Sequence, residues 1–140
     1  MTTAIDSNVI VALWNEDEAQ NLAAKKALGE SQMQGRLVIC AAVYAELMAA
    51  PERSETFVDH FCEEAGIVVE WELEEKVWRE AGKAFQSYAA RRRKQKGVEA
   101  RHILADFVIG VHALVNGYKL LTLDASIYQA SFPRLSIRSL

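Results

Sequence analysis

Short apolar runs alternate along this chain with longer stretches of helical periodicity. The runs are apolar throughout instead of at every second position, as expected of strands buried on both faces of a parallel sheet. Strands are predicted at residues 3–5, 37–40, 66–70 and 119–123, with a weaker fifth at 135–138. Helices are predicted at residues 9–14, 18–34, 42–49, 53–65, 72–93 and 101–116. This alternation places the chain in the α/β class.

Length and composition are those of one compact domain, expected to span residues 1–140. The 140 residues are 51% hydrophobic, and a domain of this size buries roughly two thirds of its unfolded surface. Nothing before Asp6 has the pattern of a secretory signal, and no apolar run is long enough to cross a membrane. We therefore expect a cytoplasmic protein whose two cysteines, Cys40 and Cys62, are buried free thiols.

One segment is strongly basic although the chain has a formal net charge of −3. Between residues 91 and 101 a single acidic residue, Glu99, stands against a group of basic ones. The basic residues are Arg91, Arg92, Arg93, Lys94, Lys96 and Arg101. Such a block can bind the phosphate backbone of a nucleic acid. It can equally be a solvated helix end followed by a mobile loop, which we place at residues 94–100.

Four acidic residues fall where an open parallel sheet gathers its functional groups. Ligands bind at the carboxyl ends of the strands of such a sheet, above all where the strand order reverses. Asp6 directly follows the first predicted strand, and Asp124 follows the fourth. Glu46 lies in the helix after the second strand, and Asp106 lies in the helix before the fourth. Four separate segments are therefore expected to bring carboxylates to one edge of the sheet.

Each of these acids has a structural alternative. An aspartate after a strand is often a helix N-cap that accepts backbone N–H bonds, and both Asp6 and Asp124 fit that role. Glu46, in AAVYAELMAA, and Asp106, in RHILADFVIGVHAL, have mostly apolar neighbours, so neither is expected to be an ordinary solvated side chain. Carboxylates are seldom buried without a partner. Lys and Arg are nearly absent from these four segments, which leaves a divalent cation as the partner.

Magnesium suits a group of carboxylates because it keeps several waters and contacts phosphate oxygens through its open positions. Manganese accepts the same oxygen ligands. We take Asp6 and Asp106 as the central ligands, with Asp124 and Glu46 binding the metal directly or through water. A carboxylate-held metal near a basic segment predicts phosphodiester chemistry. One or two ions would activate and orient a water and neutralise the charge that develops on the phosphate.

Three short polar residues stand beside these acids in the sequence. Ser7 and Asn8 follow Asp6, and Thr122 precedes Asp124 by two positions. Their side chains are suited to hydrogen bonds that fix the orientation of the carboxylates. Ser7 and Asn8 could at the same time cap a helix, and the two roles are compatible.

Other small α/β proteins with acids at strand ends fit this sequence less well. A phosphoacceptor receiver domain needs an Asp at the end of its third strand and a Lys after its fifth. Here the third strand ends VVEW and the fifth has only Arg138. A phosphatase with an aspartyl nucleophile needs D-x-D at the first strand, where this chain has D-S-N. A purely structural domain would leave the four acids unexplained.

Four stretches together resemble the PIN-domain nucleases, and within them the VapC-type toxins of bacterial and archaeal toxin-antitoxin systems. They are AIDSNVIVALW, YAEL, ILADFVIGVHALVNGYKLLTLD and the closing Tyr128 with FPRL. They stand in the family's order and separation over essentially the whole chain. The resemblance implies a three-layer α/β/α fold with a central, mostly parallel sheet of four to five strands.

The resemblance also assigns residues to roles. The acidic quartet of the family corresponds to Asp6, Glu46, Asp106 and Asp124. The family's polar residue after its first Asp, its Asn, and its hydroxyl before the last Asp correspond to Ser7, Asn8 and Thr122. The basic stretch at residues 91–101 matches no strict family motif, so its role in RNA contact depends on its charge alone.

The activity and partners implied by the resemblance are specific. Such toxins are metal-dependent endoribonucleases that cut tRNA or rRNA, usually form dimers, and are inhibited by a cognate antitoxin. The carboxy-terminal segment of the antitoxin enters the acidic groove and commonly delivers an Arg to the acids. For this chain the resemblance implies Mg²⁺ or Mn²⁺, an RNA substrate, a homodimer, and an antitoxin docked near the helices from Ala42 to Ala65. An RNA-maturation or RNA-decay nuclease, or a PIN domain that binds without cutting, remains an alternative.

Overall fold

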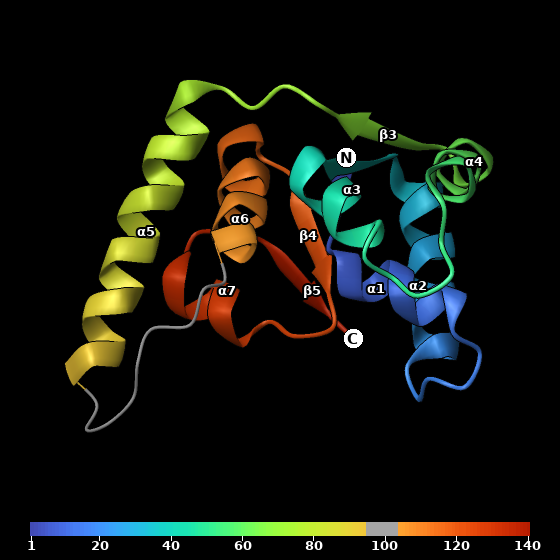
Figure 1. Ribbon diagram of the computed structural model, residues 1–140, viewed down its shortest axis with the longest axis horizontal. Helices are drawn as coiled ribbons and strands as arrows, with labels where there is room; N and C mark the ends of the chain where they lie inside the picture. Colours follow the sequence, from blue (N-terminus) through green and yellow to red (C-terminus); the bar gives the residue numbers. More distant parts are fainter. Residues whose placement is uncertain (95–103) are drawn as a thin grey trace.

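The computed structural model of this protein describes residues 1–94 and 104–140. These residues form five strands and seven helices (Figure 1). The strands are β1 (Thr2–Ile5), β2 (Arg36–Cys40), β3 (Ile67–Glu70), β4 (Lys119–Thr122) and β5 (Ile137–Ser139). The helices are α1 (Ser7–Trp14), α2 (Asn21–Gln34), α3 (Ala41–Leu47), α4 (Glu55–Ala65), α5 (Glu75–Lys94), α6 (Leu104–Asn116) and α7 (Ser126–Ser131).

The strands form one sheet in the order β3-β2-β1-β4-β5, and every neighbouring pair is parallel. The predicted α/β class is therefore confirmed, and the sheet is parallel throughout its five strands. The weak fifth strand is also confirmed, although it begins at Ile137 and pairs with β4. Parallel strands need long crossover connections, and the helices between them provide these.

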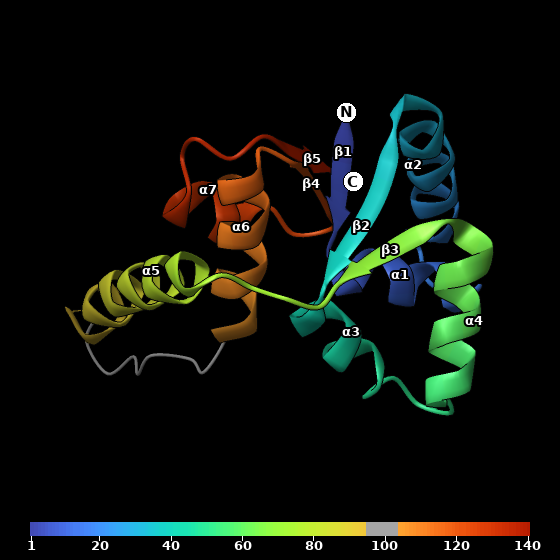
Figure 2. The ribbon, with the colours of Figure 1, turned by 90° about the horizontal axis from the view of Figure 1, so that it is seen from above.

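Helices cover both faces of the sheet, which gives the three-layer arrangement (Figure 2). One face carries α1, α2 and α4, while the other carries α6, with α7 beside it and α5 packed against its outer side (Figures 1 and 2). Helix α3 lies at the carboxyl end of the sheet, where it contacts both α1 and α6. The two layers of helices therefore meet at the edge where β1, β2 and β4 end.

Burial explains why the central strands are apolar throughout. In β1, β2 and β4 nearly every side chain is buried, because a helical layer covers each face of the sheet. The edge strands β3 and β5 are only partly covered. On α6 the close approach of Phe132 requires a glycine, since a Cβ at Gly110 would lie 2.4 Å from that ring.

Several predicted boundaries differ from the structure. The predicted strand start at Gly66 is instead the cap of α4, with a left-handed φ of 70°, a conformation that glycine adopts without strain. Helix α7 was not predicted, because six residues span less than two turns and show no clear period. Lys94 closes α5, and the rest of the loop predicted at residues 94–100 lies outside the described residues.

The prediction of two buried free thiols is confirmed for Cys40 and Cys62. Burial raises the pKa of both thiols, so neither forms the reactive thiolate readily. Among the helices described, none is long and apolar enough to cross a membrane.

Candidate active site

The strand order reverses at β1. From β1 the chain proceeds to β2 and β3 on one side and later returns to β4 and β5 on the other. The crevice beyond the carboxyl ends of β1 and β4 is therefore the position where open α/β sheets bind ligands. The strand register pairs Ile5 with Leu121, and the Asp6 N–H donates to the Leu121 carbonyl at 2.9 Å. This register places Asp6 beside Thr122.

Asp6 is the most deeply buried of the four acids, with 4% of its surface exposed. Its Oδ2 atom accepts hydrogen bonds from the Thr122 Oγ1 and from the Tyr128 hydroxyl, each at 2.8 Å. Burial raises the pKa of Asp6, and these hydrogen bonds partly oppose the effect. Asp6 stands at the N-cap position of α1, but its side chain makes no capping hydrogen bond. The capping alternative therefore does not account for this carboxylate.

The short polar residues connect the acids to one another. Ser7 Oγ donates to Glu46 Oε1 at 2.9 Å, which joins the start of α1 to α3. Asn8 Nδ2 donates to Thr122 Oγ1 at 3.3 Å, and Asn8 Oδ1 accepts from the Leu123 N–H at 3.2 Å. All three residues predicted to orient the carboxylates thus make side-chain hydrogen bonds within the site.

Glu46 and Asp106 approach the crevice from different helices. The apolar neighbours of Glu46 in the sequence do not enclose it as expected, because Val43 and Leu47 turn into the core while Glu46 is exposed and bonds Ser7 across the crevice. Partial burial nevertheless raises its pKa, against the hydrogen bond from Ser7. Asp106 is half-buried in the first turn of α6, where the helix dipole favours a negative charge.

The pKa of Asp106 shows that the four acids are neighbours. Burial, followed by the charges of Asp6, Glu46 and Asp124 in that order, raises it to about 6. Neighbouring carboxylates disfavour one another's ionised form. The structure thus brings the acidic quartet, defined as Asp6, Glu46, Asp106 and Asp124, to one place.

Asp124 differs from the other three because it is exposed and has a structural role. Its Oδ1 accepts from the Ser126 N–H at 3.1 Å and from Ser126 Oγ at 2.7 Å. These bonds hold the turn into α7 and keep the pKa of Asp124 below its ordinary value. The N-cap position of α7 is Ala125, so Asp124 is not the N-cap considered above, although its Oδ1 accepts a backbone N–H at the start of the helix.

The donor set of the quartet fits a divalent cation. In the described part of the chain, none of the seven ion pairs involves a quartet carboxylate. In that part of the chain, no group of three or more His, Cys, Asp and Glu side chains is arranged to hold a metal ion. Magnesium typically takes one or two carboxylates and completes its shell with water, so a ready three-residue site is not required. Asp6 and Asp106 are the pair with the least solvent and the strongest need for a positive partner.

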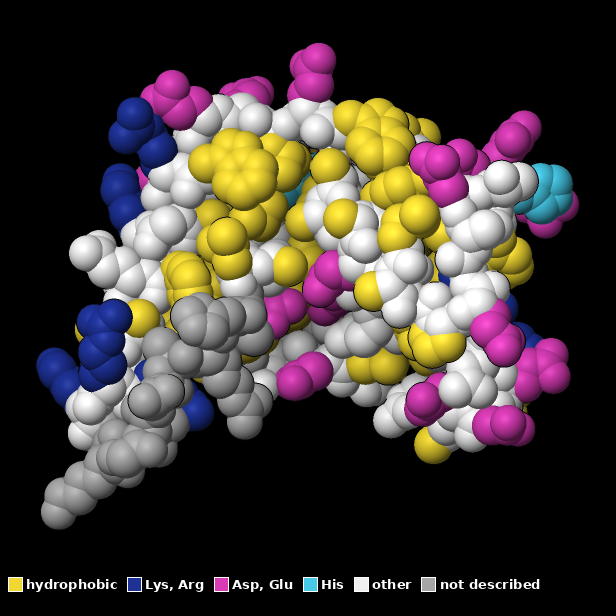
Figure 3. Space-filling model, in the orientation of Figure 1, with side chains coloured by type: hydrophobic (Ala, Val, Ile, Leu, Met, Phe, Trp, Pro, Cys, Tyr) yellow, Lys and Arg dark blue, Asp and Glu magenta, His cyan; other side chains and the backbone are white. Residues whose placement is uncertain are grey.

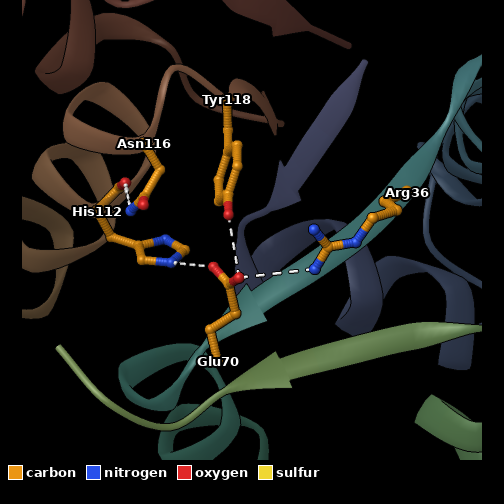
Figure 4. Close-up of polar contacts among 5 residues, drawn as sticks. All are labelled: Arg36, Glu70, His112, Asn116 and Tyr118. Carbon is orange, nitrogen blue, oxygen red and sulfur yellow. Dashed lines mark hydrogen bonds and ion pairs between the residues drawn. The ribbon is translucent and has the colours of Figure 1, made fainter.

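Glu70 shows how this protein satisfies a carboxylate that has cationic neighbours (Figure 4). It accepts from the Tyr118 hydroxyl at 3.0 Å, lies 2.8 Å from His112 Nε2, and lies 3.7 Å from Arg36 Nη2. His112 is buried, and its pairing with Glu70 ties the end of β3 to α6. Glu70 therefore has basic side chains as partners, whereas no carboxylate of the acidic quartet takes part in an ion pair among the described residues.

The described part of the basic segment forms the last turn of α5, with Arg91, Arg92, Arg93 and Lys94. The space-filling view shows basic side chains along the α5 edge and acidic ones near the middle of the same face (Figure 3). Basic residues also stabilise a helix C-terminus through its dipole, so this turn has a structural explanation as well. Lys96 and Arg101, predicted to contact RNA, lie outside the described residues.

Tyr128 is the site residue to which the sequence assigned no role. Its hydroxyl contacts Asp6, although its side chain belongs to the core. A buried tyrosine usually finds a hydrogen-bond partner. The sequence offered one signal: Tyr128 follows Asp124 by four positions, so its hydroxyl could be expected to bond an acid of the site.

An apolar groove borders the quartet on the side of Glu46. It has a volume of about 380 Å³ and lies between α3, α5 and α6. Trp78 and Leu104 in its wall are 51% and 46% exposed. The groove is lined by Ala42, Ala45, Glu46, Trp78, Leu104, Ala105 and Val108. A hydrophobic segment with one basic residue would match this combination of an apolar wall and an acidic end.

Comparison with known families and structures adds to this geometry. The sequence matches the PIN domain family over residues 3–133. No curated protein sequence is significantly similar to the chain.

Several solved structures are similar to this one. VapBC-1 from nontypeable Haemophilus influenzae has a TM-score of 0.66 and 21% identity, covering 99% of this chain and 98% of the other. VapBC2 from Rickettsia felis, bound to a DNA fragment from its promoter, has a TM-score of 0.61 and 18% identity, covering 100% and 99%. The sarcin-ricin loop cleaving toxin VapC20 from Mycobacterium tuberculosis has a TM-score of 0.61 and 14% identity, covering 93% and 95%. At these identities the likeness is one of fold.

Proposed function

The chain belongs to the PIN domain family, and from that premise we propose that it is a metal-dependent endoribonuclease, the toxin of a toxin-antitoxin pair. The acidic quartet carries the proposal, because three of its members raise the pKa of the fourth at the reversal point of the sheet. The toxin assignment is supported by the VapBC and VapC structures that share the fold over nearly their whole length. RNA in the cytoplasm is the proposed substrate.

The residues have separate tasks in this proposal. Asp6 and Asp106 hold a magnesium ion, or manganese in its place, while Glu46 and Asp124 contact it directly or through water. A bound ion supplies Lewis acidity and an activated water for attack on the phosphodiester. The Thr122 hydroxyl holds one oxygen of Asp6, which keeps this carboxylate in a fixed orientation.

Ser7 has the matching task on the other side of the site. Its bond to Glu46 keeps α3 and α1 in register at the crevice, so that this exposed carboxylate remains near the other three. Asn8 acts one step further out, because it bonds both Thr122 and the backbone of Leu123. Together these bonds connect α1, β4 and α3 around the proposed metal position.

The test is cleavage of total tRNA and rRNA by the purified protein, in magnesium and in EDTA, with the product ends mapped. The Asp6→Asn variant, purified identically, is the matched control, since the substitution removes one ligand charge without changing side-chain volume. Discrete cuts are expected only with the wild-type protein in magnesium. Cuts that persist in EDTA or in Asp6→Asn would contradict the proposed chemistry.

The basic turn of α5 is proposed to bind the RNA backbone. Replacing Arg91, Arg92 and Arg93 by glutamine should weaken RNA binding at low salt and lower the slope of log K against log salt by about 2. The reason is that a protein that makes fewer phosphate contacts displaces fewer counterions from the RNA when it binds. Binding is measured by fluorescence anisotropy in the Asp6→Asn background, so that the RNA stays intact.

A matched control removes basic residues from another helix. Lys25 and Lys26 are exposed on α2, which covers the opposite face of the sheet from α5. Their replacement by glutamine should leave the salt slope nearly unchanged. Equal losses in the two variants would mean that binding follows net charge and that the α5 turn has no specific role.

The antitoxin is proposed to occupy the apolar groove beside Glu46. This position uses α3, as the resemblance implied, but pairs it with α5 and α6 in place of α4. An apolar segment would cover Trp78 and Leu104, and an adjoining arginine would reach the carboxylates that have no basic partner among the described residues.

A further inference from the structure

The hydroxyl of Tyr128 donates its proton to a member of the acidic quartet. The side chain is 1% exposed, and its ring packs in the hydrophobic core. The hydroxyl donates to Asp6 Oδ2 at 2.8 Å and lies near the Asp106 carboxylate. Burial, followed by the charges of Asp6 and Asp106, raises the pKa of the phenol. A phenol has one O–H, and here that single proton is donated to Asp6.

Core packing alone does not explain this hydroxyl. A phenylalanine would fill the same space, and burying an additional hydroxyl costs free energy unless a partner satisfies it. The partner of this hydroxyl is Asp6, and Asp106, the second acid proposed to hold the metal, lies nearby. The polar atom of Tyr128 is therefore directed at the site and not at the core.

Two hydroxyls from different elements fix one oxygen of Asp6. Thr122 at the end of β4 and Tyr128 on α7 both donate to Oδ2, so the plane of the carboxylate is held from two directions. Neither bond occupies Oδ1, which stays available to a cation. Tyr128 also lies near Asp106, whose charge acts on its hydroxyl.

We propose that Tyr128 is a positioning residue that sets the orientation of Asp6 and its separation from Asp106 before a divalent cation binds. This inference rests on the proposed function, in which those two acids are the central ligands. Two carboxylates repel each other when no cation is present. The hydroxyl offsets part of this repulsion and prevents the side chains from rotating apart, so the ion meets ligands that are already arranged.

The test is a manganese titration of the whole protein, without RNA, in which electron paramagnetic resonance measures free Mn²⁺. Tyr128→Phe keeps the ring and its packing, and removes only the hydroxyl. Loss of a hydrogen bond that orients a metal ligand typically weakens metal affinity by about 10–100-fold. We expect Tyr128→Phe to bind Mn²⁺ at least about tenfold more weakly than wild type, while its circular dichroism stays native.

Tyr118→Phe is the matched control, because it also removes a tyrosine hydroxyl bonded to a carboxylate. That hydroxyl donates to Glu70 Oε2 at 3.0 Å, in the separate network that joins β3 to α6 (Figure 4). Its Mn²⁺ affinity should equal that of wild type. In cleavage assays, Tyr128→Phe should need more metal for half-maximal rate, with the KM for RNA unchanged.

The outcomes separate this inference from the proposed function. Weaker Mn²⁺ binding in Tyr128→Phe alone supports the positioning role, even if no RNA is cut. Equal affinities of wild type and Tyr128→Phe would overturn it, even if wild type cuts RNA in magnesium. A wild-type protein that binds no Mn²⁺ would overturn both. Equal weakening by Tyr118→Phe would also overturn it, since the effect would then not be specific to the hydroxyl at the acidic quartet.

Discussion

The Asp106→Asn variant is expected to cut RNA roughly 10²–10³-fold more slowly than wild type and, without metal, to unfold at a higher temperature. These two effects have opposite signs and a common cause. Asp106 carries a charge that burial and three neighbouring carboxylates oppose, as its pKa of about 6 shows. Asparagine removes that charge, which relieves the metal-free protein but deprives a cation of a central ligand.

The stability effect depends on pH in a defined direction. A carboxyl with a raised pKa in the folded state favours folding at low pH, and this contribution is lost as pH rises from its ordinary 3.8 through about 6. The stability gap between Asp106→Asn and wild type should therefore widen between pH 4 and pH 7.5. Because Asp106 is only half-buried, solvent screening limits the gap to on the order of 1 kcal/mol, or about 3–4 °C.

Melting curves in EDTA at several pH values, together with cleavage assays in magnesium, measure both effects on one preparation. Asp17→Asn is the control, since Asp17 is an exposed acid beyond the far end of α1. It should change neither cleavage nor the pH dependence. Cleavage by Asp106→Asn at the wild-type rate would show that Asp106 is not a ligand of the metal. A melting temperature that falls at pH 7.5 would show that its charge stabilises the fold.

Magnesium is expected to raise the melting temperature of the wild-type protein by roughly 10 °C when its concentration reaches about 100 times Kd. A ligand that binds only the folded state contributes about 2.7 kcal/mol at that excess, and 1 kcal/mol corresponds to roughly 3–4 °C for a domain of this size. The expected rise is large because the ion neutralises carboxylates that otherwise repel one another. Differential scanning fluorimetry with increasing MgCl₂ measures it directly.

Two comparisons make this prediction specific. Asp6→Asn should lose most of the rise, because it removes the most buried of the four charges. The same ionic strength supplied as NaCl should give only a small shift, since screening acts weakly on partly buried charges. A rise in Asp6→Asn equal to that of wild type would place the magnesium elsewhere on the protein.

The strands illustrate how much of the fold was predictable. Residues 37–40 and 119–122 were recognised as strands because a helical layer on each face requires unbroken apolar runs there. Helix α7 and the boundary at Gly66 were not, because a short helix has no period and a glycine cap is also compatible with a strand. The exposure of Glu46 was misjudged for a related reason. Apolar neighbours in sequence point around a helix, so they need not surround the residue between them.

The sequence by itself determined the parallel α/β class and named the acids that the structure brings together. Both conclusions depend on local pattern: apolar strands record burial on two faces, and an acid just after a strand must lie at its carboxyl end. Only the tertiary structure decided that β1 and β4 are neighbours, which places Asp6 beside Thr122. Strand order is set by long-range packing among many residues, so no single stretch encodes it.

The tertiary structure also decided which groups satisfy those acids. Tyr128 reaches Asp6 across 122 positions of sequence, and Asp124 bonds Ser126 at the start of a helix that was not predicted. The raised pKa of Asp106 arises from burial and from charges on three other segments of the chain. Hydrogen bonds and Coulomb interactions act through space over a few ångströms, so sequence could name the acids, but only the folded chain could give each one its partners.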